Sequence, residues 1–351
     1  MTDWRRVAPK VQRLKVAGHH DEALALLAPV AEGLRAGGDV AEAIEASIQE
    51  ALLLGFVGQR DAALARSSWA LAQVHRPEHA ERLRQRDAAW SVTAAFCLFA
   101  ATCTRQGGVQ LDRALAALDA GVGFVERVGR PSWRAGLLAE RAAVLRAQGD
   151  DEGAVAVEAE ALALKRSDPA TPGVHLHSMI RGHAYNLKLV GRVEEAAELL
   201  HGLLAEPDVS VLDRFAAWVY LTHNALAREQ TAEAEEAVGH AIELAEQLSV
   251  PQQATALGAA FEVHKARGDW AAAREVSARH LELAEQCSVS TRVCARMDGF
   301  DAAVALGEPA AAAEHLREME RLVTQLQGRG HRTYDEDLEE RKAVMEGISG
   351  G

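Results

Sequence analysis

The sequence predicts an all-α fold, a right-handed superhelical α-solenoid of about eight helix pairs followed by one closing helix. Three observations predict it. A phrase in which an alanine follows a glycine by five residues recurs along the chain. Apolar residues flank each phrase at the three- and four-residue spacing of a helix face, and no stretch alternates apolar and polar residues as a strand would. We therefore expect about 17 helices in antiparallel pairs and no sheet.

The phrases occur in the order Gly18–Ala23, Gly58–Ala63, Gly108–Ala114, Gly149–Ala154, Gly191–Ala196, Glu229–Ala234, Gly268–Ala273 and Gly307–Ala312. The third has one additional residue, and the sixth keeps the spacing but has glutamate in place of glycine. Successive phrases begin 40, 50, 41, 42, 38, 39 and 39 residues apart, so the third unit is the least regular. Two units are also similar in sequence, because Ala241–Gln247 matches His280–Gln286 at a separation of 39 residues.

Each phrase marks the turn between the two helices of a pair. In the fourth unit, Leu138, Ala142 and Leu145 form an apolar face before Gly149, and Ala154 begins a second apolar face after it. The glycine is expected to adopt the positive φ that ends a helix. The alanine is expected to let the two helices approach each other closely.

The positions of prolines, of serine and threonine residues and of acidic residues predict the remaining elements. Prolines are expected near the starts of first helices, at Pro77, Pro131, Pro172, Pro207 and Pro251. The segment Ala88–Thr104 is uncharged over 17 residues, but its serine and threonines favour a buried helix over a membrane span. Tyr334–Glu346 is expected to form an acidic closing helix. The predicted domains are therefore residues 1–330, the repeat array, and residues 331–351, the capping helix and tail.

These features resemble the tetratricopeptide repeat (TPR) superfamily. The residues that carry the resemblance are the Gly-x-x-x-x-Ala phrases and large apolar pairs in first helices, such as Trp218 with Leu221 and Phe96 with Phe99. The units are near 40 residues long instead of about 34, as in the kinesin-light-chain-like and bacterial regulator-type members. The resemblance covers nearly the whole chain.

Composition excludes some classes of partner. The 351 residues include 51 Asp and Glu and 38 Lys and Arg, a net charge of −13, whereas a nucleic-acid-binding protein needs a basic face. We expect no nucleic-acid partner and no membrane. The four cysteines, Cys97, Cys103, Cys287 and Cys294, have no C-x-x-C spacing, and no apolar run follows the N-terminal charges. We therefore expect reduced thiols in a cytoplasmic protein.

The search for catalytic motifs finds little. Gly121-x-Gly123 lacks the third glycine and the preceding strand of a dinucleotide loop, and the sequence contains no P-loop, His-Glu-x-x-His or Gly-x-Ser-x-Gly motif. His175, His177 and His183 are the best metal candidates, but on one helix His175 and His177 would point about 200° apart. We expect no enzyme activity, no cofactor and no metal.

The candidate binding residues lie on the first helices, which line the concave side of such arrays. In the fifth unit the packing stripe is Ile180, Ala184 and Leu187, and a second stripe about 100° away is Arg181, Tyr185 and Lys188. Neighbouring units add Arg146, Tyr220, His223, Asn224 and Lys265. The stripe continues through Gly258 and Glu262 in the seventh unit and Met297 and Asp301 in the eighth.

We interpret this stripe as a basic and aromatic surface inside an acidic protein. It would take an acidic segment of a protein or peptide, with an apolar portion of the partner toward uncharged Leu52 and Cys97. An alternative is a solvated helix face, whose charges pair with carboxylates such as Glu140 and Glu262. Because these residues lie off the packing stripe, replacing Arg181 and Lys188 is expected to leave stability nearly unchanged.

The first functional hypothesis is a non-enzymatic scaffold or adaptor that holds a peptide or partner segment in its groove. The second is a regulator whose superhelix changes shape around a small molecule or signal peptide, as the regulator-type resemblance implies. The sequence contains no helix-turn-helix or effector domain, which counts against the second. An all-helical enzyme, the third hypothesis, lacks a recognisable site.

Overall fold

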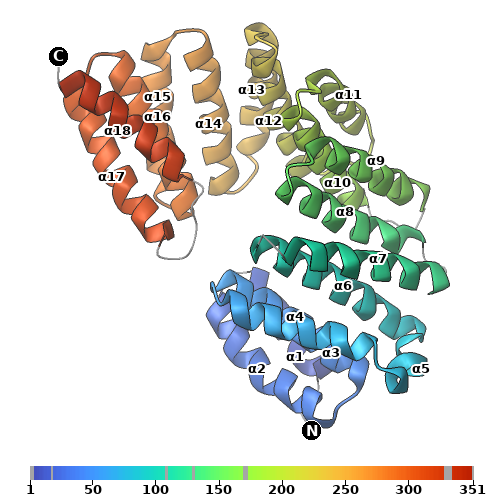
Figure 1. The fold of residues 1–351 in the computed structure, drawn as a ribbon. Helices are drawn as coiled ribbons and strands as arrows, with labels where there is room; N and C mark the ends of the chain where they lie inside the picture. Colours follow the sequence, from blue (N-terminus) through green and yellow to red (C-terminus); the bar gives the residue numbers. More distant parts are fainter. Residues whose placement is uncertain are drawn as a thin grey trace. The chain divides into compact units, whose positions relative to one another are not determined.

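The chain is all-α in a computed structural model that describes residues 4–16, 19–106, 110–128, 131–168, 173–327 and 334–349 (Figure 1). No strand occurs in these ranges. The helices form two compact units, Met1–Thr171 and Pro172–Gly351, and each is described by itself. The predicted all-α class is thus confirmed.

The first unit consists of four antiparallel helix pairs. Its α-helices are α1 (Trp4–Val16), α2 (His20–Gly37), α3 (Val40–Phe56), α4 (Arg60–Val74), α5 (Ala80–Leu83), α6 (Arg86–Gln106), α7 (Gln110–Val128), α8 (Pro131–Ala147) and α9 (Asp151–Ser167). A 3-10 helix, η1 (Pro77–His79), precedes α5. The pairs are α1/α2, α3/α4, α6/α7 and α8/α9.

The second unit consists of four further pairs and a closing helix. These are α10 (Gly173–Leu189), α11 (Val193–Leu204), α12 (Val211–Ala227), α13 (Thr231–Ala245), α14 (Val250–Ala266), α15 (Trp270–Ala284), α16 (Val289–Ala305), α17 (Pro309–Gln327) and α18 (Asp335–Ser349). The closing helix α18 packs on α17, where Leu338 is buried beside Met319 and Leu322. The boundary at residue 330 stays a prediction.

The long third unit is explained by one short insertion. Between α4 and α6 the chain forms η1 and then the single turn of α5, and Leu83 of that turn is 2% exposed in the core of the first unit. Pro77 therefore begins the 3-10 helix and not the first helix of the pair, which corrects the expectation. The uncharged segment Ala88–Thr104 lies within α6, as predicted.

The turns inside the pairs adopt the expected backbone conformation. Gly58, Gly149, Gly191, Gly268 and Gly307 all have φ between 70° and 84°. Glu229, which replaces glycine in the sixth unit, has φ 58° and so takes the same left-handed conformation with a side chain. Gly18 and Gly108 lie outside the described residues. The conformation thus belongs to the repeat and not only to its glycines.

The alanine of each phrase lies at the contact between two helices. Ala23, Ala114, Ala154, Ala196, Ala234, Ala273 and Ala312 are 0% exposed and Ala63 is 3% exposed. A methyl group at this point lets the helix backbones approach, and a larger side chain would have no space. The burial of all eight alanines agrees with the prediction that alanine packs between the helices of a unit.

In the second unit the first helices form a continuous layer. Pairs α10/α12, α12/α14 and α14/α16 pack on each other, and the second helices show no comparable mutual packing in the described part of the chain. The first helices are therefore the inner layer of this unit. Serine or aspartate side chains cap several helices, as where Ser210 accepts from the Asp213 N–H and Ser288 from the Thr291 N–H.

Within the described residues, no single helix is long and apolar enough to cross a bilayer. The bent pair formed by Pro77–Leu83 and Ala88–Thr104 reaches that length and composition only when both segments are taken together.

Candidate functional site

The inner face of the second unit begins on α10. Ile180, Ala184 and Leu187 are 0%, 1% and 3% exposed, so the predicted packing stripe is confirmed. Tyr185 is 45% exposed and therefore lies on a different side of the helix. Its ring is 6.0 Å from that of Tyr220 on α12, at an interplanar angle of 39°. Adjacent first helices thus bring two predicted site residues into ring contact.

Lys188 and His223 are brought together by the same two helices. Both are partly buried, and Lys188 has no carboxylate partner among the described residues. Burial lowers the pKa of Lys188. Burial, and to a lesser extent the nearby Lys188 ammonium, lowers the pKa of His223 to about 4. At neutral pH the pair therefore presents one uncompensated positive charge beside a neutral imidazole.

The partly exposed side chain of Arg181 is engaged by a buried carboxylate. One of its terminal nitrogens lies 3.1 Å from Oδ1 of Asp213, a residue that is 2% exposed. Oδ2 of the same carboxylate accepts from the Ser210 hydroxyl at 2.7 Å and lies 3.5 Å from Nδ1 of His177. Nε2 of His177 in turn lies 3.1 Å from Glu206. The Arg181 charge therefore neutralises a buried carboxylate between α10 and α12.

Three other predicted residues are also engaged or buried. Arg146, in the first unit, lies 2.6 Å from Glu158. Asn224 is 2% exposed, so its amide does not reach the inner surface. Lys265 lies 2.9 Å from Asp301 and 3.7 Å from Glu262. Glu262 is one of the two carboxylates expected to pair with this stripe if it is only a solvated helix face. The structure thus brings together Tyr185, Lys188, Tyr220 and His223. Asn224 is buried, and Arg146, Arg181 and Lys265 each pair with a carboxylate of this chain.

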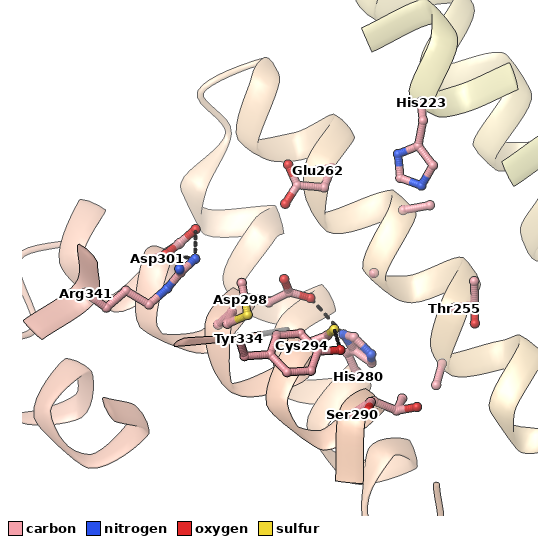
Figure 2. A pocket seen from close by; sticks show the side chains of 15 residues that line it. His223, Thr255, Glu262, His280, Ser290, Cys294, Asp298, Asp301, Tyr334 and Arg341 are labelled. Carbon is pink, nitrogen blue, oxygen red and sulfur yellow. Dashed lines mark hydrogen bonds and ion pairs between the residues drawn. The ribbon is translucent and has the colours of Figure 1, made fainter. Parts of the chain in front are cut away.

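A pocket of about 410 Å³ lies farther along the same face (Figure 2). Its lining residues come from α12, α14, α15, α16, α18 and the segment before α18: His223, Ala254, Thr255, Gly258, Ala259, Glu262, His280, Ser290, Thr291, Cys294, Met297, Asp298, Asp301, Tyr334 and Arg341. This lining includes four residues of the stripe predicted from the sequence, Gly258, Glu262, Met297 and Asp301. His223 belongs both to this wall and to the pair with Lys188, so the two parts of the face adjoin.

A buried imidazole and carboxylate form part of the pocket wall. Nδ1 of His280 lies 2.8 Å from Oδ2 of Asp298, and the two residues are 3% and 8% exposed. Burial raises the pKa of Asp298, against the opposing effect of His280. Gly258 on the facing helix makes room for the ring, because a Cβ there would lie 3.3 Å from Cε1 of His280. A glycine at position 258 therefore leaves space for the His280 ring in the pocket wall.

The closing helix contributes the far wall. Arg341 of α18 lies 3.0 Å from Oδ1 of Asp301, and its guanidinium lies 5.8 Å from the ring centre of Phe300. The hydroxyl of Tyr334 lies 3.6 Å from Sγ of Cys294, and burial raises the pKa values of both. Contacts between α18 and α16 therefore shape this end of the pocket.

Sequence reasoning missed His280, Cys294, Asp298, Tyr334 and Arg341. One signal was available, because the repeat alignment places His280 opposite Ala241. Ala241 is fully buried in its own pair. A histidine at an alanine packing position needs both a space and a polar partner, which Gly258 and Asp298 supply. The other four residues have no periodic signature.

No family model matches the sequence, and no curated protein matches it. Solved structures do match its fold. A tetratricopeptide repeat protein from Parabacteroides merdae ATCC 43184 aligns over 86% of this chain and 98% of its own, with a TM-score of 0.54 and 15% identity. The fold is a helical-repeat solenoid similar to that of tetratricopeptide repeat proteins.

Two other solved structures are similar to this TPR-like chain. A Rap protein complexed with competence and sporulation factor aligns over 91% of this chain and 74% of its own, with a TM-score of 0.51 and 14% identity. The apo form of the quorum sensor NprR from B. thuringiensis covers 98% of both chains, with a TM-score of 0.50 and 10% identity. At these identities the likeness extends to the fold alone. In the described TPR-like repeats, no group of three or more His, Cys, Asp or Glu residues is placed to hold a metal ion.

Proposed function

We propose that this TPR-like protein is a non-enzymatic interaction protein that binds an acidic segment of a protein or peptide partner along α10 and α12. One observation carries the proposal. Lys188 is a half-buried cation with no carboxylate partner among the described residues, one helical turn from the exposed ring of Tyr185. A partly desolvated charge without a counter-ion is unfavourable by itself, so a carboxylate supplied by a partner gains more there than at an exposed lysine.

The neighbouring aromatic rings support the same proposal. The rings of Tyr185 and Tyr220 lie 6.0 Å apart, and tyrosine faces and hydroxyls can contact a peptide at little cost in conformational entropy. Arg181 and Lys265, by contrast, already neutralise carboxylates of this chain. The proposed acidic contact therefore centres on Lys188.

Signal sensing is a second candidate, in which binding changes the shape of the solenoid. Similarity to a Rap protein solved with competence and sporulation factor, and to a quorum sensor of matching length, favours it. For this chain, such sensing would require that a bound peptide alter the packing between successive first helices. Small-angle scattering with and without a selected peptide separates the candidates, since a scaffold keeps its scattering profile and a sensor changes it.

A peptide selection tests the primary proposal. A random peptide library displayed on phage is selected on the immobilised full-length protein, and the affinities of enriched peptides are measured by calorimetry. We expect sequences that combine Asp or Glu with apolar residues, weaker binding at higher salt, and a loss of affinity of about tenfold or more in Lys188→Glu.

The matched control is Lys10→Glu, which makes the same charge change at an exposed position of α1 in the other unit. Lys10→Glu should bind the selected peptides as the wild type does. Equal binding by Lys188→Glu and wild type would show that the inner face of α10 is only a solvated surface.

A further inference from the structure

A group of arginines lies on α16 and α17, on the side of α16 opposite the pocket that Asp298 lines. Arg296 is two residues from both Cys294 and Asp298, so helix periodicity places it on that opposite side. The arginines lie one turn apart in each helix, and they are Arg292 and Arg296 of α16 and Arg317 and Arg321 of α17. A second pocket, of about 360 Å³, lies among them and is lined by Arg296, Glu314, Arg317, Glu318 and Arg321.

The guanidinium groups in this second pocket are not all paired. Nε of Arg321 donates to the Glu318 carboxylate at 2.9 Å. Arg296, by contrast, lies 3.7 Å from Glu285, which is beyond hydrogen-bond distance. Arg317 is exposed and has no carboxylate partner among the described residues. Each of the two helices therefore presents a guanidinium group that no carboxylate in the described part of the chain binds closely.

Packing of the repeat does not require these arginines. The preceding pair, α14 and α15, has its helix starts 39 residues earlier and the same turn between its helices. In that pair, the positions equivalent to the four arginines hold Gln253, Leu257, Ala278 and Glu282. Leu257 is 7% exposed, so a position that buries an apolar side chain in one pair holds the Arg296 guanidinium in the next. The arginines are thus a feature of the last pair and not of the repeat.

Neighbouring side chains respond to the positive charge. The pKa of Glu318 is lowered, first by its hydrogen bond from Arg321 and further by Arg296 and Arg292, against the opposing effect of burial. Burial lowers the pKa of His315, and the Arg296 charge lowers it further. Both effects favour negative over positive charge around the pocket, although the chain as a whole has a net charge of −13.

We propose that this second pocket binds a phosphoryl group. Guanidinium groups form paired N–H···O bonds with phosphate oxygens. Arg296 and Arg317 come from different helices, and a tetrahedral phosphoryl group can accept from both because its oxygens point in several directions. A phosphate monoester also has a charge of about −1.5 to −2 at neutral pH, which suits two cations better than a single carboxylate does.

The phosphoryl group could belong to a phosphorylated side chain of a partner or to a small phosphate ester. N-acetylphosphoserine N-methylamide imitates the first source, and glycerol 3-phosphate represents the second. N-acetylserine N-methylamide and glycerol are their uncharged counterparts, and N-acetylaspartate N-methylamide offers a carboxylate instead. The phosphate probe that binds more tightly identifies the source.

Amide NMR of the full-length protein, in a phosphate-free buffer of low ionic strength, provides the test. We expect at least one phosphate probe to shift the amide signals of α16 and α17 around Arg296 and Arg317 saturably. The uncharged counterparts should leave these signals unmoved, and the aspartate derivative should bind more weakly than the phosphate probe.

Variants then assign the shift to the pocket. Arg317→Gln should weaken binding of the phosphate probe by about tenfold. Arg279→Gln, the same change at an exposed position of α15 outside the pocket, should not alter it. Glu314→Gln removes a negative charge from the wall and should strengthen binding by about twofold or more. Its control is Glu275→Gln, at the equivalent exposed position of α15, which should bind as the wild type does.

Three results would overturn the inference: no saturable shift with either phosphate probe, equal shifts with the uncharged counterparts or equal affinity for the aspartate derivative, and wild-type affinity in Arg317→Gln. Unchanged amide signals elsewhere in the chain establish that this variant is folded. The inference goes beyond the proposed function, because the second pocket is on the other side of α16 from the inner face. None of these results therefore bears on the peptide selection, which depends on Lys188.

Discussion

Arg181 lies 3.1 Å from the buried carboxylate of Asp213, and this ion pair joins α10 to α12 beneath the surface that Lys188 occupies. The two cations lie seven residues apart on one helix, but their electrostatic environments differ. Arg181 compensates a buried charge, and Lys188 has no such partner among the described residues.

The first prediction separates these two roles. Arg181→Ala should lower the free energy of unfolding by about 1–3 kcal/mol, because it leaves Asp213 with less compensation in a buried site. Lys188→Ala should be neutral or slightly stabilising. Urea unfolding followed by circular dichroism measures both variants. The expectation that replacing either residue leaves stability unchanged therefore applies to Lys188 alone, and equal effects of the two substitutions would contradict this distinction.

The second prediction concerns the alanine contacts. Ala154→Leu in α9 should cost about 1–3 kcal/mol through overpacking, since Ala154 is 0% exposed against α8. Ala196→Leu should do the same in the second unit. Because each repeat stabilises its neighbours, hydrogen exchange should accelerate in adjacent pairs as well. Ala159→Leu, at an exposed position of α9, is the control and should melt as the wild type does.

The third prediction concerns Glu229. Its φ of 58° is strained for a residue with a Cβ, so Glu229→Gly should stabilise the protein by about 0.5–1 kcal/mol. Glu236→Gly, an exposed position inside α13, should instead destabilise it by about 1 kcal/mol. Opposite shifts of the thermal midpoint are therefore expected from the same chemical change. Shifts of the same sign would count against backbone strain at Glu229.

The fourth prediction concerns pH. The pKa of His223 is about 4 in the folded chain and ordinarily 6.5, so between these values the unfolded chain binds a proton that the folded chain does not. This contribution makes the free energy of unfolding decrease as the pH falls through that window. His223→Gln should flatten the decrease. In Lys188→Ala the pKa of His223, measured by NMR titration, should rise, and an unchanged value would mean that Lys188 is too distant to act on it.

The repeat architecture could be read from local sequence because its signals are local. A glycine five residues before an alanine, as at Gly149 and Ala154, fixes both the turn and the helix contact within one short segment. The 3.6-residue period of a helix placed Ile180 and Tyr185 on different faces of α10, and so predicted which face is the inner one. It also placed Glu262 and Asp301 on the stripe that lines the pocket.

Only the tertiary structure decided which of these charges are free. Arg181 is seven residues from Lys188, but its partner Asp213 is on another helix, and no spacing rule relates the two. The pocket likewise joins His280, Asp298 and Arg341 from three helices, and Arg341 comes from outside the repeats. Helix periodicity determines the direction of a side chain from its own axis. The distance between charges on different helices depends on how the pairs pack, and that distance decides whether a charge is neutralised within the chain or left for a partner.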